Sequence, residues 1–239
     1  MALRRAVLAL LALILLTAPA LSACGGGGGG GGGSGETAPQ LLARAKTTLD
    51  KAASAHFVLT SSGAPTTGTA LVGGEGDIAR PSSFQGTLKV LAAGATVDLK
   101  VISVEGTVHA QLPFTAAYSV VDPKAFGFGD PGALLDPDTG ISQLLAKAES
   151  AKLGEEKRIA GDVVREVTAK LPGDLVEQIL TSKDPSKPVD ATFSIVEKSG
   201  KLRRAVLTGP FYEAGKDATF TLELSDFGAD VHITAPPTG

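Results

Sequence analysis

The 239-residue sequence has no tryptophan, few other aromatic residues and a single cysteine, Cys24. One cysteine forms no disulfide within the chain and leaves no cysteine pair for a zinc site. No cluster of lysine and arginine appears, and the net charge at pH 7 is −3, which argues against a nucleic-acid-binding protein. What remains is a chain that is 43% hydrophobic and long enough to bury one large core without metal ions or disulfides.

The motifs of common enzymes are also missing. The sequence contains no GxSxG, HExxH or GxxxxGK[S/T] pattern, and its three histidines are isolated from one another. Two of them, His109 and His232, are expected on the polar faces of strands, exposed to solvent. Most of the aspartates that might pair in a hydrolase lie beside proline or in turns, where aspartate is expected for structural reasons. These are Asp77, Asp122, Asp130, Asp136 and Asp138. We therefore expect a protein that is not an enzyme and has no cofactor or metal.

The N-terminus has the pattern of a bacterial lipoprotein precursor. Two arginines precede the apolar run Ala6–Leu16, which is too short for a stable transmembrane helix and typical of a secretory signal. The run ends in Leu21-Ser22-Ala23-Cys24, a branched apolar residue and two small residues before cysteine, as in a lipobox. The sequence thus predicts a signal peptide over residues 1–23 and acylation of Cys24. Two acyl chains on this cysteine would be enough for stable anchoring in a membrane.

Nine glycines, Gly25–Gly33, follow the cysteine directly. Such a segment behaves as a flexible chain, and its root-mean-square span is about 20 Å. We interpret residues 24–36 as the lipidated cysteine plus a tether, and residues 37–239 as one domain held near the outer face of the cell membrane.

The periodicity of this domain predicts both helices and strands. Helical spacing of apolar residues indicates an amphipathic helix from the Thr37 cap to about Ser54, a second near 141–148 and a short third near 173–181. Residues 121–138, rich in Asp-Pro and glycine, are expected to form a long irregular excursion. Alternation of apolar and polar residues indicates strands near 87–90, 97–101, 104–112, 163–171, 193–195, 202–207, 219–225 and 231–233.

About ten antiparallel strands with one apolar face form a large sheet that must curl and be covered by the helices. If the cover is incomplete, an apolar cavity remains between sheet and helices. The scarcity of large aromatic side chains to fill the interior favours such a cavity.

Four segments together resemble the LprG/LppX family of mycobacterial cell-envelope lipoproteins. They are GGEGDIARPSSFQGTLKV (Gly73–Val90), VDPKAFGFGDPGALLDPDTGISQLL (Val121–Leu145), LTGPFY (Leu207–Tyr212) and VHITAP (Val231–Pro236). The resemblance covers the whole chain, including the lipobox. The nine-glycine tether departs from the family pattern, which affects reach rather than binding.

The resemblance implies an α+β fold, a curved antiparallel half-barrel with helices on its concave face that encloses an apolar cavity. It also implies a monomeric carrier of membrane lipids, triacylated glycolipids or triacylglycerol across the periplasm-like space. A major-facilitator-type transporter is the membrane partner that it suggests. The alternatives are a tethered, non-catalytic scaffold for an envelope transporter or wall enzymes, and, more weakly, a binding protein for a small polar solute.

On this interpretation the acyl chains contact apolar residues of the central strands and of the second helix. The predicted cavity residues are Leu88, Val90, Val97, Leu99, Val101, Val108, Leu112, Ile141, Leu144 and Leu145.

Overall fold

The computed structural model describes residues 35–237. The predicted signal peptide, the acylation site Cys24 and nearly all of the glycine tether lie outside the described residues and stay predictions. Residues Glu36–Gly239 form one compact unit that holds the whole described core. This unit therefore has what it needs to fold independently of the residues before it.

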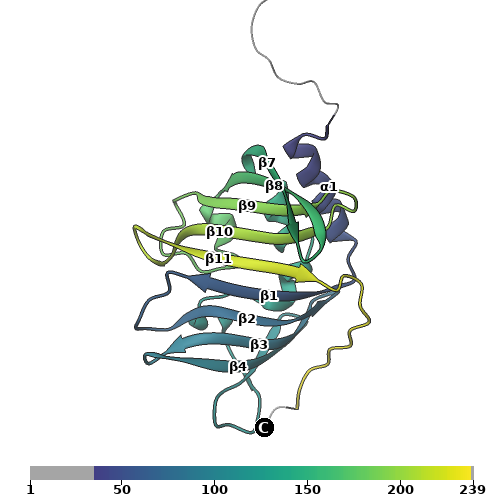
Figure 1. Ribbon diagram of the computed structural model, residues 1–239. Coiled ribbons are helices and arrows are strands. Elements are labelled where there is room, and N and C mark those ends of the chain that lie inside the picture. Colours follow the sequence, from purple (N-terminus) through teal and green to yellow (C-terminus); the bar gives the residue numbers. More distant parts are fainter. Residues whose placement is uncertain (1–34, 238–239) are drawn as a thin grey trace, which may run out of the picture. The chain divides into compact units, whose positions relative to one another are not determined.

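Eleven strands of the described part form one antiparallel sheet, in the order β6-β5-β4-β3-β2-β1-β11-β10-β9-β8-β7 (Figure 1). The first and last strands of the described residues, β1 and β11, pair at the middle of the sheet. The strands are β1 (Ser54–Ser62), β2 (Ala70–Ala79), β3 (Ser83–Ala92), β4 (Ala95–Val104), β5 (Thr107–Gln111), β6 (Ser119–Val120), β7 (Glu149–Ile159), β8 (Asp162–Leu171), β9 (Val189–Val196), β10 (Leu202–Glu213) and β11 (Lys216–Ser225).

The three predicted α-helices are present but shorter than the periodicity predicted, and two 3-10 turns accompany them. They are α1 (Ala38–Asp50), the 3-10 turns η1 (Pro123–Phe126) and η2 (Pro131–Leu135), α2 (Ile141–Ala146) and α3 (Gly173–Val176). The predicted first helix is too long because Ser54 already begins β1. Thr37 and Gln40 form the expected capping box at the start of α1. Within residues 35–237, no helix is both long enough and apolar enough to cross a bilayer.

One face of the sheet and the helices share a single hydrophobic core. On β1, Phe57 and Leu59 alternate with exposed residues, and Phe57 lies in register with Leu224 of β11. The apolar side of α1, with Leu42 and Leu49 almost fully buried, joins the same cluster. The predicted one-sided sheet with helices on its apolar face is confirmed.

Two glycines permit close packing where β2 meets β3. Gly76 and Gly86 lie opposite each other, and a Cβ added at Gly76 would lie 2.5 Å from a ring carbon of Phe84. A Cβ at Gly86 would lie only 2.2 Å from the carbonyl oxygen of Glu75. Side chains at these positions would push the strands apart, so the glycines let Phe84 fold across the inner face.

The outer face of the sheet departs from the sequence prediction at His109. This side chain is 7% exposed, and its Nδ1 finds no hydrogen-bond partner among the described residues. It lies in register between Ile102 of β4 and Val120 of β6. The prediction of a solvated histidine was wrong. Alternation along a strand predicts which residues share a face, but it does not show whether neighbouring strands cover the polar face as well.

The C-terminal segment is also different from the prediction. Residues 226–237 form no strand, although Val231 and Ile233 are partly buried while His232 is exposed. The segment borders a surface hollow together with the turn that joins β2 and β3. The alternation reflects contact with this turn rather than pairing in the sheet.

Candidate functional site

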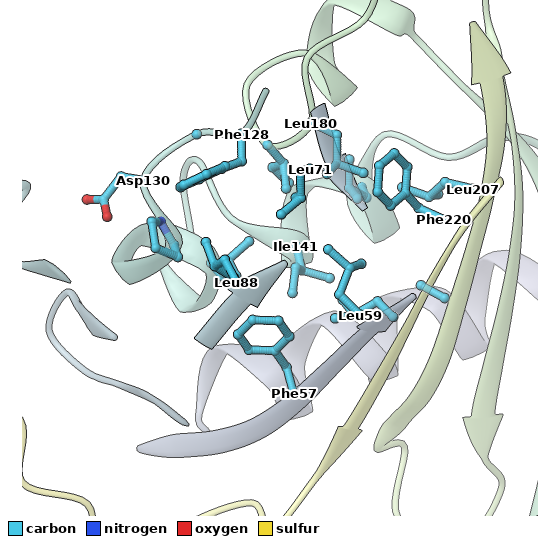
Figure 2. A pocket seen from close by; sticks show the side chains of 17 residues that line it. Phe57, Leu59, Leu71, Leu88, Phe128, Asp130, Ile141, Leu180, Leu207 and Phe220 are labelled. Carbon is cyan, nitrogen blue, oxygen red and sulfur yellow. The ribbon is translucent and has the colours of Figure 1, made fainter. Parts of the chain in front are cut away.

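An apolar pocket lies between the centre of the sheet and the layer above it (Figure 2). Strands β1, β2, β3, β10 and β11 form its floor, and η2, α2 and the segments around Phe128 and Leu180 form its cover. Its lining residues are Phe57, Leu59, Leu71, Leu88, Phe128, Gly129, Asp130, Pro131, Leu134, Ile141, Leu144, Ile179, Leu180, Ala205, Leu207, Phe220 and Leu222.

Almost all of this lining is hydrocarbon. Among the lining residues described, Asp130 is the only one with an ionisable side chain, and its carboxylate points away from the pocket in Figure 2. Its Oδ1 accepts hydrogen bonds from Ser103 Oγ, at 2.5 Å, and from the Gly132 amide, at 2.8 Å. The carboxylate thus fixes the start of η2 to β4. The pocket can accept an alkyl chain but offers little to orient a polar group.

The pocket is a narrow slot in this arrangement. Its empty volume is about 670 Å³ including space open to solvent, whereas the space open to the centre of a water molecule is about 60 Å³. The second value corresponds to about five water-sized groups. A whole lipid with several long chains therefore requires the cover to move away from the sheet.

The cover is held by a short stretch of strand-like pairing. Phe128 and Leu180 form an isolated antiparallel bridge. The Gly129 amide donates to the Ile179 carbonyl at 3.0 Å, and the Thr181 amide donates to the Gly127 carbonyl at 3.3 Å. We call residues 127–129 and 179–181 the paired cover. A few backbone hydrogen bonds are all that this pairing contributes to keeping the pocket closed.

Polar groups surround the outer side of the paired cover. Two surface hollows share residues with the pocket, and Lys124 and Gln178 line both of them. The carboxylates of Asp174 and Glu177 border one of the two. This polar rim, which we define by these four residues, gives a place outside the pocket where a charged or hydrogen-bonding group can stay in water.

A third hollow meets the other end of the pocket at Leu71 and Phe220. Tyr212 lines this hollow, and its hydroxyl donates to the Leu71 carbonyl at 2.7 Å. Burial raises the pKa of Tyr212 above its ordinary value near 10. The backbone of β2 is thereby tied to β10 beside the pocket.

The structure divides the predicted cavity residues into four groups. Leu88, Ile141 and Leu144 line the pocket. Leu112 is 39% exposed in the loop after β5, so its placement in the cavity was wrong. Val97 is only partly buried and packs on the core without lining the pocket. The remaining five are buried in the core but do not line it: Val90, Leu99, Val101, Val108 and Leu145.

Sequence reasoning missed two of the five floor strands, β1 and β2, and it placed no residue of β10 or β11 in the cavity. Leu59 of β1, together with Leu207 and Phe220 of β10 and β11, lines the pocket. In β1 the outward Val58 is also apolar, which hides the alternation. The pairing of β1 with β11, far apart in the sequence, brings these residues together.

The described residues contain no group of three or more histidine, cysteine, aspartate or glutamate side chains that could hold a metal ion.

Comparison with known proteins assigns the chain to a family. A family model described as LppX_LprAFG lipoprotein matches residues 37–233. The chain belongs to this family. It is 30% identical over 186 residues to the lipoarabinomannan carrier protein LprG of Mycobacterium tuberculosis (strain H37Rv), covering 77% of this chain and 75% of that protein. It is 27% identical over 172 residues to lipoprotein LprA of the same strain, covering 68% and 66%.

Solved structures of family members share the fold. LprF from Mycobacterium bovis superposes with a TM-score of 0.68 at 20% identity, over 86% of this chain and 100% of that one. Mycobacterium tuberculosis LppX gives a TM-score of 0.59 at 19% identity, over 82% and 99%. These matches confirm the curved antiparallel sheet with helices on one face. The predicted family is confirmed by the family model over residues 37–233. Membership of this lipoprotein family supports a membrane-associated protein of the cell envelope.

Proposed function

We propose that this protein is a non-catalytic lipid carrier, anchored through acylated Cys24 at the outer face of the cell membrane. It takes acyl chains of a membrane lipid or glycolipid into the apolar pocket and carries them toward the outer envelope. The observation that carries this proposal is the pocket itself, an almost purely hydrocarbon slot between sheet and cover. It is supported by a 30% identical relative that is named as a lipoarabinomannan carrier.

The lining explains why such a carrier would hold its cargo. Each buried CH₂ contributes about 0.8 kcal/mol, so a sixteen-carbon chain gains on the order of 12 kcal/mol on leaving water. Asp130 is turned away from the slot, so no buried charge opposes entry of a chain. The same energy prevents spontaneous loss into water, and release therefore needs an acceptor membrane or a partner that opens the pocket. A major-facilitator-type transporter acting on the monomer is such a partner.

Entry requires the two segments of the paired cover to separate from each other. The bonds between Gly129 and Ile179 and between Thr181 and Gly127 would break, while the bond from Ser103 to Asp130 would keep η2 on β4. Gly127, with φ of +90° at the end of η1, provides a left-handed hinge. The headgroup would remain at the polar rim, where Lys124 supplies a positive charge and Gln178 a hydrogen-bonding amide.

The test compares two matched phenylalanine substitutions in residues 36–239, which omit the acyl groups of Cys24. Ala205 points into the pocket from β10, whereas Val58 is exposed on the outer face of β1. The wild-type unit and both variants would be produced in an actinobacterial host, purified without detergent and extracted with organic solvent for mass spectrometry. We expect bound lipid in the wild type and in Val58→Phe, and its loss in Ala205→Phe.

Circular dichroism and a cooperative melt establish that each variant folds. If Ala205→Phe does not fold, Leu222→Trp fills the same pocket from a partly buried position on β11. Lipid retained in a folded, pocket-filled variant would overturn the proposal. A wild type free of lipid would do the same and would favour the scaffold alternative.

A further inference from the structure

The loop between β5 and β6 exposes the most prominent apolar side chain of the described residues. Phe114 at its tip is 108% exposed, more than in an extended reference peptide. Leu112 before it and Val120 after it are 39% and 64% exposed. We call residues 112–118 the apolar loop; it lies at the β6 end of the sheet order, beyond β4 at the bottom of Figure 1.

The conformation of this loop is fixed by its own hydrogen bonds. Gln111 donates through Nε2 to the carbonyls of Thr115 and Ala116, both at 3.1 Å. The amide and hydroxyl of Thr115 both donate to the Leu112 carbonyl, at 3.1 and 2.8 Å. Phe114 has a φ of +67°, which is unfavourable for an aromatic residue. The backbone of the loop is therefore strained where it presents the Phe114 ring outward. Several of its carbonyl groups already accept hydrogen bonds, which lowers the cost of bringing them near lipid.

The loop is electrically neutral in a charged domain. Residues 111–121 contain no charged side chain. The domain from Glu36 onward carries 20 basic and 25 acidic side chains, because Arg4 and Arg5 are the only charged residues before it. The loop is thus a place where this negative domain can approach lipid without desolvating charge.

From these observations we infer that the apolar loop is a membrane-docking element, which inserts Phe114 into the interface of a lipid bilayer. A stable protein partner typically covers about 800 Å² on each side of a fairly flat surface, and one projecting ring does not provide that. A bilayer interface accepts aromatic side chains one at a time, and prefers them at the level of the headgroups.

The apolar loop is connected to the paired cover through a short stretch of chain. From β6 the chain passes through Asp122, whose side chain caps η1, and reaches Phe128 of the paired cover. A loop held in the membrane is therefore linked, through a few ordered residues, to the cover of the pocket. The docking itself needs no cargo, so it can be tested separately from the proposed function.

The absence of tryptophan makes a direct test possible. In residues 36–239, Phe114→Trp places the only indole at the tip of the loop. Leu153→Trp, on the edge strand β7 and 47% exposed, is the matched control. With phosphatidylcholine vesicles we expect a blue shift of the Phe114→Trp emission, and quenching by brominated acyl chains. The Leu153→Trp emission should stay unchanged.

A second variant measures how much the ring contributes. Phe114→Ser should lower the partition coefficient of the unit onto phosphatidylcholine vesicles, measured by co-sedimentation, by about tenfold or more. Circular dichroism and a melt unchanged from the wild type show that the exposed substitution spares the fold. Adding phosphatidylglycerol should weaken the binding, because the domain is negative.

Three outcomes would overturn the inference. One is an unshifted Phe114→Trp spectrum in the presence of vesicles. Another is an equal shift in both tryptophan variants. The third is a blue shift that depends on protein concentration without vesicles, which would assign the loop to contact with a second copy of the chain.

Discussion

The centre of the sheet and its β4–β5 flank have equally apolar inner faces, yet only the centre borders the pocket. Leu59 and Leu207 at the centre line the pocket, whereas Leu99, Val101 and Val108 on the flank are buried but do not line it. Sequence alternation describes both regions in the same terms. What differs between them is the layer that lies on top.

The part of the cover nearest the flank is fixed to the sheet. η2, which also lines one side of the pocket, packs on β2, β3 and β4, and Asp130 at its start accepts the hydrogen bond from Ser103 of β4. Over the centre, the cover includes the bridge between Phe128 and Leu180, held by a few backbone bonds. The alternation of apolar and polar residues along a strand thus decides which face of the sheet is buried. How firmly the cover is fixed to the sheet decides whether space remains beneath it.

Shortening a leucine side chain to alanine should give the largest difference in the free energy of unfolding between the two regions. Leu99→Ala on the flank leaves a cavity in close packing and should lower the free energy of unfolding by about 3 kcal/mol. Leu222→Ala borders existing space from a partly buried position, so it should cost about 1 kcal/mol. Urea unfolding of residues 36–239 measures both. Equal losses would mean that the centre is packed as tightly as the flank.

Enlargement should give the opposite contrast with a matched pair of alanines. Ala110 on β5 and Ala205 on β10 are both almost fully buried, but only Ala205 lines the pocket. Ala110→Leu should destabilise the fold by about 2 kcal/mol, because an overfilled core must shift its neighbours. Ala205→Leu should be close to neutral, since the added carbons enter existing space. The midpoint of urea unfolding compares the pair, and a larger loss for Ala205→Leu would argue against the pocket.

The elements of this fold could be predicted from local sequence where one face is buried and the other is wet. β3, β4, β8 and β11 alternate clearly, and the capping box at Thr37 marks the start of α1. Short cover elements were predicted poorly. The third helix is a single turn followed by residues that pair with the loop at Phe128, which is a tertiary contact that no local pattern encodes.

The candidate site could be predicted only as a kind of surface. Leu88 was found because it lies on the apolar inner face of β3, and Ile141 and Leu144 because they form the apolar side of α2. Leu112 was wrongly included because alternation continued past Gln111, where β5 ends. The floor residues of β1 and β11 depend on pairing between strands more than 150 residues apart, and their register is invisible without the fold.

The smallest expected effect tests how dry the far end of the pocket is, at Tyr212. Because burial raises its pKa, Tyr212 should ionise above pH 10 in the folded chain. Its protonated form therefore contributes to the free energy of unfolding below pH 10, and this contribution is lost as the pH rises through the raised pKa. The chain has two tyrosines, so the difference in tyrosinate absorbance between wild type and Tyr212→Phe isolates this group. The variant should lose about 1 kcal/mol with the hydrogen bond to Leu71, and its stability should fall less steeply above pH 10 than that of the wild type. Titration of Tyr212 at an ordinary pKa would show that water reaches this end of the pocket. The space beneath the cover would then be open to solvent at Leu71.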